Sequence, residues 1–485
     1  MQNKWKKLIL PGFIIALGVF LRLYKYETWF AYGHDYDLLG WFVKDVVVNG
    51  HFRLIGQETS TPGIFIGPLF YYYQVLFYLV FSLNPIGGVF GVLLLSIFSV
   101  WSFYYVFRQM FSLRVGTVAM FFSAVSYYMV SNDREVFPTM PVILWSVWFL
   151  YTIFLLLKGK QTGYFVAGIL IGLIWHMNMA LIIVLPLLLL AILFSKQKVQ
   201  WKNVFIGFVL ATVLSLPLVL FEIRHGGVQT RAFLTSLTTN QGGVIEGTYR
   251  YEKVLISMGN NLKSMLLGPL ISVNYRLVLV LLFGVWVMVF IRKNLESKLL
   301  GLLFVWFILY LLFFANYSKV MSEYYINGSL IVFLTPLFVI LGKFKNRWLF
   351  LVMVTFVSLN VVSFLTQKVE PKGYVEKRDL INFIKADAQE HNYSCVAISY
   401  ITNPGYERGY RYLYWYQGLK VLTPISGAPV YSIVFPLAIV DRIDTRFGSL
   451  GLIFPDYSKY DPKDVEKSCS GEDSNLTDPM HGFVQ

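Results

Sequence analysis

The chain has few charged residues for its length. Only 14% of its 485 residues are charged, whereas 56% are hydrophobic and the mean hydropathy is +0.59. Soluble domains average about 25% charged residues, so this composition excludes an ordinary soluble protein. The apolar residues form continuous runs rather than the short alternating segments of a membrane β-barrel. We therefore expect an all-α polytopic membrane protein.

Motifs for soluble cofactors are also missing. The two cysteines, Cys395 and Cys469, form neither a CxxC pair nor a zinc-ligand pattern. The sequence has no P-loop, no GxGxxG, no HExxH and no serine-hydrolase elbow. We therefore predict no metal ligands and no required cofactor, and a divalent metal ion has no support in the sequence.

The net charge of +14 raises the question of nucleic-acid binding. Most of the lysine and arginine residues, however, lie in short loops between apolar runs, as the positive-inside rule describes. Such clusters also suit anionic lipid head groups. We therefore predict membrane lipids, and no nucleic acid, as partners.

About eleven apolar runs approach the length of about 20 residues that a membrane crossing takes. The first run follows Lys4, Lys6 and Lys7 and is followed by no small-residue cleavage site, so we interpret it as an uncleaved span with a cytoplasmic N-terminus. Basic clusters in alternate loops should also be cytoplasmic. The expected spans are residues 8–24, 86–107, 115–131, 138–157, 163–178, 179–195, 203–222, 275–291, 298–316, 325–342 and 348–366.

One further apolar run, residues 63–81, does not fit this alternation. The first span ends outside and Arg108 should be inside, so an odd number of crossings is required between them. We therefore predict that this run lies along or dips into the outer leaflet, with Tyr71 and Tyr72 at the interface. The alternative is that the run spans the membrane and that one basic cluster breaks the rule.

Charges and turn residues return from about residue 367 onward. Residues 377–390 have a helical pattern, and the segments 395–402, 418–423, 430–434 and 451–454 are strand candidates. We predict a small extracytoplasmic α/β domain, residues 367–485, after a transmembrane domain of residues 1–366. Both cysteines fall in it, and disulfides persist outside the cytoplasm. A Cys395–Cys469 bridge and two separate thiols both fit the sequence.

The first outer loop, residues 25–85, carries an acidic cluster close to the membrane boundary. Asp35 and Asp37 share a face if the segment is extended and diverge if it is helical. A carboxylate at such a boundary is partly desolvated, which raises its basicity. That property suits a general base that takes a proton from a hydroxyl, whereas two solvated loop acids are the ordinary alternative.

Other polar side chains stand near the outer ends of expected spans. Arg134 can clamp a lipid phosphate or pair with the neighbouring acids. His176 lies in an apolar hairpin, where a polar residue suits a hydrogen bond to a substrate. Glu323, followed by Tyr324, can stabilise the N-terminus of a helix or face the same cleft.

The order of these features resembles the membrane glycosyltransferases of the GT-C superfamily, specifically the members related to protein O-mannosyltransferases and to the lipid A aminoarabinose transferase. The resemblance covers most of the membrane part. It depends on the acidic loop Gly33-His34-Asp35-Tyr36-Asp37, the stretch Gly67-Pro68-Leu69-Phe70-Tyr71-Tyr72, the basic turn at 105–116, the loop at 132–138 and the late Glu323-Tyr324-Tyr325.

The resemblance implies inverting transfer of a sugar from a polyprenyl-phosphate donor to a hydroxyl of a lipid, glycan or protein on the outer face of the inner (plasma) membrane. An acid of the first outer loop would deprotonate the acceptor, and the choice between Asp35 and Asp37 stays open. The lysine that many relatives place before their Pro-Pro turn is absent here. The candidates for binding the donor phosphate are therefore Arg134, Lys44 and Arg53, and the candidate substrate contacts are His34, Tyr71, Tyr72, His176, Glu323 and Tyr324.

A transporter or flippase for lipids or lipid-linked sugars, without transferase activity, is the alternative function. Coupled transport favours acids deep within the spans. Such acids are nearly absent here, because Glu222 and Glu323 lie near span ends. The sequence therefore favours the transferase.

Overall fold

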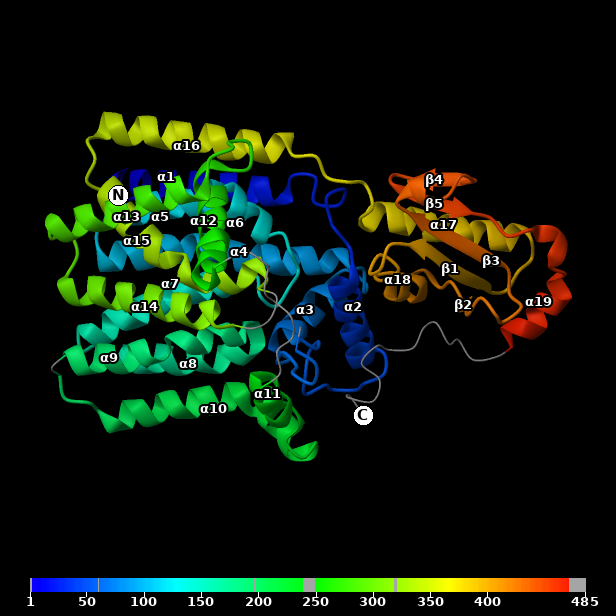
Figure 1. Cartoon of the computed structure of the whole chain (residues 1–485), viewed down its shortest axis with the longest axis horizontal. Helices are drawn as coiled ribbons and strands as arrows, with labels where there is room; N and C mark the ends of the chain where they lie inside the picture. Colours follow the sequence, from blue (N-terminus) through cyan, green and yellow to red (C-terminus); the bar gives the residue numbers. More distant parts are fainter. Residues whose placement is uncertain (1, 60, 196, 239–248, 318–320, 471–485) are drawn as a thin grey trace. The chain divides into compact units, whose positions relative to one another are not determined.

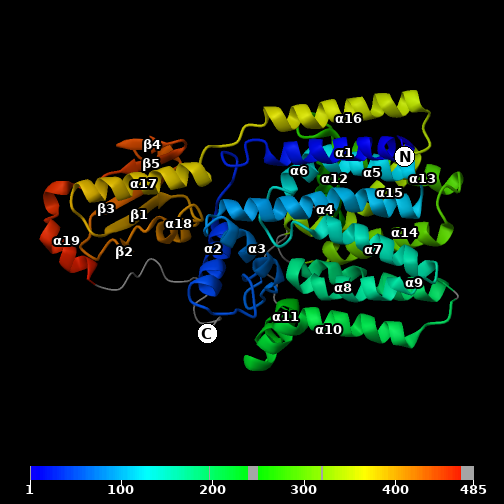
Figure 2. The same ribbon diagram turned by 180° about the vertical axis from the view of Figure 1, so that it is seen from behind.

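The computed structural model describes residues 2–59, 61–195, 197–238, 249–317 and 321–470. Parts of the expected outer loops 223–274 and 317–324, and residues 471–485 of the expected C-terminal domain, lie outside these ranges. The described chain is mostly helical, with one small sheet near its C-terminus (Figures 1 and 2).

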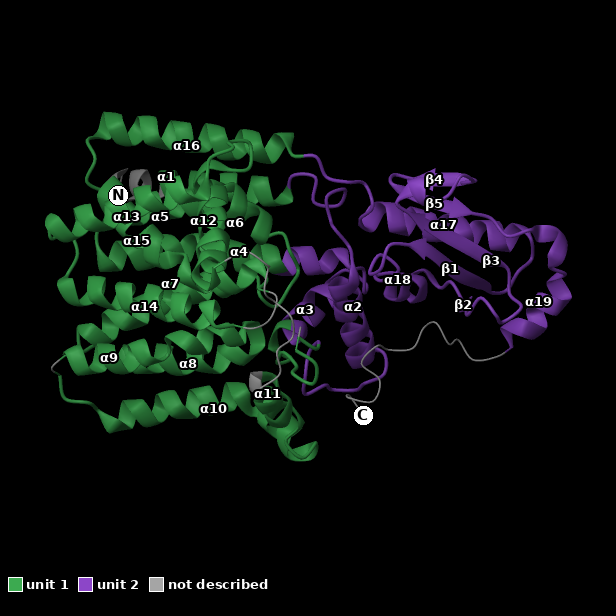
Figure 3. Cartoon of the chain, in the orientation of Figure 1, with its two compact units in different colours: residues 1–23, 58–70, 92–367 green, residues 24–57, 71–91, 368–485 purple. Residues whose placement is uncertain are grey.

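The described residues divide into two compact units (Figure 3). Unit 1 contains residues 1–23, 58–70 and 92–367, and unit 2 contains residues 24–57, 71–91 and 368–485. One division, at 367/368, lies one residue from the boundary at 366/367 that the sequence predicts. Residues 24–57 and 71–91, which include most of the expected first outer loop, group with the C-terminal segment rather than with the helices of unit 1.

Each expected span overlaps an apolar helix. Four helices are long and apolar enough to cross a membrane singly, and η2 with α15 forms a further candidate that is bent by 49°. The remaining apolar helices are shorter, so the number of crossings stays a prediction. In chain order the helices of this part are α1 (Gln2–Leu23), α4 (Ile86–Met110), α5 (Leu113–Val125), α6 (Tyr127–Asn132), α7 (Val142–Leu157), α8 (Thr162–Met177), η1 (Met179–Val184), α9 (Pro186–Ser195), α10 (Trp201–Arg224), α11 (Val228–Thr238), α12 (Arg250–Leu267), α13 (Tyr275–Ile291), α14 (Ser297–Ala315), η2 (Glu323–Ser329), α15 (Ile331–Leu341) and α16 (Asn346–Thr366).

The helices of unit 1 pack closely where small residues meet. Helices α8 and α10 lie side by side in both views of the ribbon (Figures 1 and 2). A Cβ atom built at Gly168 of α8 would collide with the backbone of Gly207 in α10. Small residues let two backbones approach in this way, and such contacts are the usual basis of helix association in membranes.

The expected outer loop 223–274 contains two helices, α11 and α12, that the sequence did not predict. In the view of Figure 1, α12 runs across the neighbouring helices of unit 1. Its buried apolar residues recur at helical spacing, with Val254, Met258 and Leu262 fully buried. Asn261 on the same helix donates hydrogen bonds to the Glu323 carbonyl oxygen (3.1 Å) and to Asn327 Oδ1 (3.2 Å). These contacts attach α12 to the bent segment η2.

Helix α3 (Leu69–Val80) is the helical part of the apolar run at 63–81. Its 12 residues cover about 18 Å at 1.5 Å per residue, whereas the hydrocarbon core is about 30 Å thick. Helix α3 alone is therefore too short to cross a membrane. This length favours the expected interfacial or re-entrant placement over the spanning alternative.

Unit 2 contains the expected α/β segment. Its sheet has the strand order β2-β1-β3-β5-β4, in which β1 pairs in parallel with β2 and β3, and β5 pairs antiparallel with β3 and β4. The expected helix and the four strand candidates are all present, whereas β4 and the four short helices of this part were not predicted. The elements are α17 (Tyr374–Glu390), β1 (Val396–Thr402), α18 (Arg411–Gln417), β2 (Val421–Leu422), β3 (Val430–Phe435), η3 (Leu437–Ile439), β4 (Thr445–Phe447), β5 (Leu450–Ile453), η4 (Tyr457–Lys459) and α19 (Pro462–Cys469).

A disulfide joins Cys395, just before β1, to Cys469 at the end of α19. The Cα atoms of the two residues are 5.6 Å apart, and 74 residues separate them in sequence. The bridge that the sequence left open is therefore present, and it ties the end of α19 to the start of β1.

Candidate active site

The acidic cluster of the first outer loop lies on a helix, α2 (His34–Val47), within unit 2. Asp35 and Asp37 fall in its first turn, where negative side chains interact favourably with the helix dipole. Its apolar residues, such as Leu39 and Phe42, are buried. Residues two positions apart in a helix are separated by about 200° around its axis. The carboxylates of Asp35 and Asp37 therefore point to different surroundings.

Asp35 is half-buried and makes one long polar contact. Gln57 Nε2 donates a hydrogen bond of 3.4 Å to Asp35 Oδ1. Burial raises the pKa of the Asp35 carboxyl group, and the neighbouring His34 and the bond from Gln57 oppose the rise only in part. A carboxylate with a raised pKa and partial exposure is a competent proton acceptor.

Asp37 is buried, with 3% of its surface exposed. Its Oδ1 accepts a hydrogen bond of 2.9 Å from the backbone N–H of Tyr412, at the start of α18. Burial raises the pKa of Asp37 to about 6, against the opposing effects of this hydrogen bond and of the positive charge on Lys377. Asp37 is therefore held by protein groups on a side of α2 away from solvent.

The tyrosines of α3 help to shape the surroundings of Asp35. The backbone N–H of Gln57, whose side chain contacts Asp35, donates a 3.2 Å hydrogen bond to Tyr71 Oη. Tyr71 is buried beneath Gly56, where any Cβ atom would collide with its ring. Tyr72 is half-buried, and its hydroxyl donates to the Arg53 carbonyl oxygen at 2.8 Å. Tyr71 thus positions the residue that binds Asp35, whereas Tyr72 keeps part of its ring accessible.

His34, the first residue of α2, is half-buried next to Asp35. Burial lowers the pKa of its imidazole, and the nearby charges of Arg408 and Arg411 lower it further, while Asp35 opposes the shift. His34 is therefore held mainly neutral at neutral pH, which leaves it able to donate or accept a hydrogen bond.

The two basic candidates of unit 2 differ in how far their charge is already used. Arg53 is 4% exposed, and its Nε donates to Asp45 Oδ2 at 2.7 Å. Lys44 is half-buried, with Nζ 4.3 Å from the ring centroid of Trp41 and 5.4 Å from that of Trp415. Arg53 is therefore already paired with a carboxylate, whereas Lys44 makes aromatic contacts, and phosphate binding by either residue stays a prediction.

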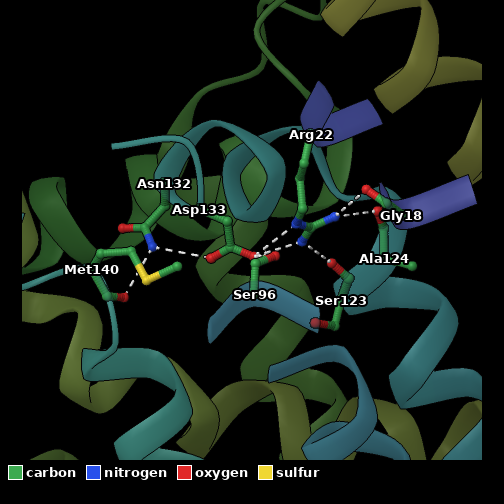
Figure 4. A network of polar contacts seen from close by, with 8 residues as sticks. All are labelled: Gly18, Arg22, Ser96, Ser123, Ala124, Asn132, Asp133 and Met140. Atoms are coloured by element: carbon green, nitrogen blue, oxygen red, sulfur yellow. Dashed lines mark hydrogen bonds and ion pairs between the residues drawn. The ribbon is translucent and has the colours of Figure 1, made fainter. Parts of the chain in front are cut away.

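The second acidic loop forms a closed network in unit 1, which Figure 4 shows in close-up. Arg22 of α1 donates to Asp133 Oδ2 from Nη2 (2.6 Å) and Nε (3.1 Å), and its remaining donors reach the carbonyl oxygens of Gly18, Ser123 and Ala124. Ser96 Oγ donates to the same Asp133 oxygen at 2.9 Å. Arg22 and Asp133 are 2% and 4% exposed. This network fastens α1 to α4 and to the α5–α6 segment.

Arg134 follows Asp133 but does not share its network. Arg134 Nη1 donates to the Leu21 carbonyl oxygen at 3.2 Å, and the guanidinium carbon lies 5.4 Å from the ring centroid of Phe364. Burial lowers the pKa of Arg134 to about 10. Binding of the donor phosphate by the Arg134 guanidinium stays a prediction.

His176 is held by backbone groups at both ring nitrogens. The backbone N–H of Leu69 donates to its Nδ1 at 3.2 Å, and its Nε2 lies 2.8 Å from the Leu214 carbonyl oxygen, to which it donates. Both ring nitrogens are therefore engaged, and the residue is 2% exposed. His176 thus fixes the turn at 67–69 against α8 and α10, and its expected contact with a substrate stays a prediction.

Glu323 and Tyr324 open η2 and are both exposed. The Glu323 carboxyl lies in the first turn of that helix, as the capping alternative requires, and exposure also leaves it accessible. No group of three or more His, Cys, Asp or Glu side chains that could hold a metal ion occurs in the described ranges. A metal requirement and the substrate roles of Glu323 and Tyr324 therefore stay predictions.

Sequence reasoning missed several residues around the acids. No sequence pattern identifies Gln57 or Tyr412. Each contacts α2 through a hydrogen bond, from a side-chain amide in Gln57 and from the backbone N–H in Tyr412. Two signals were available. Lys377 interrupts the apolar face of the helix at 374–390, and Arg22 lies at the end of an apolar span, where ionised side chains are rare and usually paired.

The sequence and the fold can now be compared with those of known proteins. Residues 62–221 match the family model described as dolichyl-phosphate-mannose-protein mannosyltransferase. No curated protein matches the chain in sequence.

Three solved structures share the fold at low sequence identity. A crystal structure of ArnT from Cupriavidus metallidurans bound to undecaprenyl phosphate aligns with a TM-score of 0.63 and 12% identity, over 95% of this chain and all of that one. The apo oligosaccharyltransferase of Archaeoglobus fulgidus aligns with a TM-score of 0.52 and 15% identity, over 85% of this chain and 64% of that one. The Archaeoglobus fulgidus enzyme AglB, in complex with an inhibitory peptide and a dolichol-phosphate, aligns with a TM-score of 0.50 and 13% identity over 89% and 69%.

The two kinds of comparison agree on the resemblance that the sequence suggested. The resemblance is therefore confirmed at the level of fold and of a partial family match: the chain shares the fold of ArnT and of the Archaeoglobus fulgidus oligosaccharyltransferase, and its residues 62–221 match the dolichyl-phosphate-mannose-protein mannosyltransferase model.

Proposed function

We propose that the protein is a membrane glycosyltransferase that takes a sugar from a polyprenyl-phosphate donor and transfers it, with inversion, to a hydroxyl of a lipid, glycan or protein acceptor. The observation that carries the proposal is the environment of Asp35: a half-buried carboxyl group with a raised pKa and a single long hydrogen bond from Gln57. The family match and the fold support the lipid-linked donor, because related solved structures hold undecaprenyl phosphate or dolichol-phosphate.

In the proposed reaction Asp35 acts as the general base. Its carboxylate takes the proton of the acceptor hydroxyl while the acceptor oxygen attacks the anomeric carbon of the donor. The bond between that carbon and the phosphate oxygen breaks, and the polyprenyl phosphate leaves with the bonding electrons. The new glycosidic bond forms on the opposite face of the sugar, which inverts the anomeric configuration. The protonated Asp35 then releases its proton to water.

The departing phosphate needs a nearby positive charge, since stabilising developing charge is usually the largest part of catalysis. Lys44, which is half-buried on the same helix as Asp35, is the proposed cation. The basic residues Arg134 and Arg53 are the other candidates from the sequence. His34 and Tyr72 are the proposed contacts to substrate near Asp35, because both are half-buried on the segments that surround it. We propose no metal requirement for this proton transfer.

The proposed topology places the reaction on the outer face of the inner (plasma) membrane. Eleven crossings with a cytoplasmic N-terminus put the basic loops inside and unit 2 outside. The Cys395–Cys469 bridge supports this placement, because disulfides persist in oxidising compartments and are rare in the cytosol.

A transfer assay tests the proposal. Purified protein would be incubated with a panel of radiolabelled polyprenyl-phosphate sugars and candidate acceptors, as wild type and as Asp35→Asn. We expect transfer by the wild type with inverted configuration and a loss of about 10²- to 10⁴-fold in Asp35→Asn, the usual contribution of a general base. Transfer by the variant at the wild-type rate would remove Asp35 from the mechanism. Movement of labelled lipid across vesicles without any transfer would favour the flippase.

A further inference from the structure

Asp37 ties the start of α2 to the α/β part of unit 2. Its carboxylate is 3% exposed and accepts the 2.9 Å hydrogen bond from the Tyr412 N–H, across 375 residues of sequence. The Tyr412 ring also lies against Gly40, one turn further along α2, where any Cβ atom would collide with it. The same residue of α18 therefore contacts α2 by a backbone donor and by its side chain.

A buried lysine provides a second connection at the same place. Lys377 of α17 is 6% exposed, and its Nζ donates to the carbonyl oxygens of Arg408 and Gly409, both at 3.3 Å. It also lies 4.1 Å from the ring centroid of Tyr410. Its positive charge faces Asp37 and offsets part of the cost of burying that carboxylate. Lys377 thus holds the segment 408–410 that leads into Tyr412.

The backbone before α2 is in contact with the same segment. A Cβ atom built at Gly409 would lie 2.7 Å from the carbonyl carbon of Gly33, the residue that precedes α2. The Tyr374 N–H donates to the Phe30 carbonyl oxygen at 2.9 Å, and Arg378 Nη1 is 2.6 Å from Glu27 Oε1. Residues on both sides of Asp35 are therefore fixed by α17, α18 and the segment between them.

We infer that Asp37 is a positioning residue, which acts with Lys377 and Tyr412 to fix the first turn of α2 so that the Asp35 carboxylate is held at the acceptor hydroxyl. The inference rests on the proposed function for the role of Asp35. Because the helix separates the two side chains by about 200°, the contact that fixes Asp37 leaves Asp35 on the other side, next to Gln57. The C-terminal part of the chain is then a component of the active site rather than an accessory to it.

The experiment separates position from charge with four variants of the full-length protein. Asp37→Asn keeps an oxygen that accepts the Tyr412 N–H, whereas Asp37→Ala removes it. Asp35→Asn removes the proposed base. Asp464→Asn is the matched control, because its carboxyl group is 73% exposed on the same unit. Transfer kinetics would be measured with the donor on which the wild type is active.

For Asp37→Ala we expect kcat to fall about 10- to 100-fold with the donor KM unchanged, since a displacement of about 1 Å has effects of this size. Asp37→Asn should stay within about threefold of wild type, because the hydrogen bond is retained. Wild-type kcat in Asp37→Ala would overturn the inference. A loss in Asp37→Asn as large as in Asp35→Asn would also overturn it, since the Asp37 charge would then be catalytic.

A readout that needs no turnover distinguishes failure of this inference from failure of the proposed function. Hydrogen–deuterium exchange of residues 34–47 should be faster in Asp37→Ala than in wild type, and unchanged in Asp37→Asn, Asp35→Asn and Asp464→Asn. Equal protection in Asp37→Ala and wild type would overturn the positioning role, whether or not any donor is used. If exchange is faster in Asp37→Ala but the wild type transfers no sugar, the positioning of α2 by Asp37 is supported and the proposed transferase function is rejected.

Discussion

Two acidic segments lie near expected membrane boundaries, and their carboxylates have different surroundings in the folded protein. In unit 1, Asp133 is 4% exposed and accepts hydrogen bonds from Arg22 and Ser96. In unit 2, Asp35 is half-buried and receives a 3.4 Å contact from Gln57. A carboxylate whose oxygens are occupied by fixed donors stabilises the fold, whereas one with remaining capacity and a raised pKa can take a proton. Similar sequence context therefore does not imply a similar role.

The largest expected effect comes from breaking the closed network. Arg22→Met leaves Asp133 buried without its cation, which should lower the stability of the protein by about 3–5 kcal/mol. Thermal or chemical unfolding in detergent measures the change. The control is the double variant Arg22→Met with Asp133→Leu, which removes both charges and should recover most of the loss. Asp35→Asn, by contrast, should unfold at the wild-type midpoint, and equal stability of Arg22→Met and wild type would contradict the comparison.

A second effect concerns the bridge in unit 2. Replacing Cys395 and Cys469 together by serine removes a cross-link over 74 residues, and losses of about 2–4 kcal/mol are typical. We expect the midpoint of thermal unfolding to fall in the double variant. The same fall should appear in wild type after reduction, and the double variant should show no further change with reductant. A reductant-dependent shift in the variant would point to another cause.

The decrease of activity at low pH tests the role of the Asp35 carboxylate. Asp35 must be ionised to accept a proton, and burial raises the pKa of its carboxyl group above the ordinary value of 3.8. The kcat/KM of the wild type should therefore fall as the pH drops through that raised pKa, by about tenfold per pH unit below it. The residual activity of Asp35→Asn should lack this decrease. An unchanged decrease in the variant would assign it to another group.

The smallest effect is expected for an exposed ion pair, which serves as the reference for the buried one. Arg276 Nη2 lies 2.6 Å from Glu252 Oε1, and its side chain is 68% exposed. Exposed pairs contribute little to stability because water and salt screen them, so Arg276→Gln should leave the unfolding midpoint nearly unchanged. A destabilisation as large as that of Arg22→Met would remove burial as the reason for the difference between the two pairs.

Local patterns predicted much of the fold. The apolar runs identified the helices, the return of charge located the α/β segment, and its β-branched runs marked β1 and β3. The length of α3 also agrees with the expected interfacial placement of residues 63–81. These features depend on residues that are near one another in the sequence, through apolar periodicity and composition. A single sequence contains that information.

The site was less accessible to sequence reasoning because its key contacts join distant residues. Whether Asp35 and Asp37 share a face depended on whether residues 34–37 are helical, which their spacing left open. The partner of Asp37 lies 375 residues away and the partner of Asp133 lies 111 residues away. Nothing near either acid in the sequence identifies Tyr412 or Arg22. His176 was correctly singled out as a buried polar residue, but its two backbone partners gave it a structural role.

Unit 2 is built from segments near the start of the chain and segments after residue 367, and this has a consequence for biosynthesis. The segment that carries Asp35 is made among the first residues of the chain, but the Tyr412 N–H that holds Asp37 leaves the ribosome 375 residues later. The early segment therefore lacks this partner until translation supplies residue 412. A chain that ends before that residue would carry the acid but not its support, so we expect it to lack the proposed transfer activity.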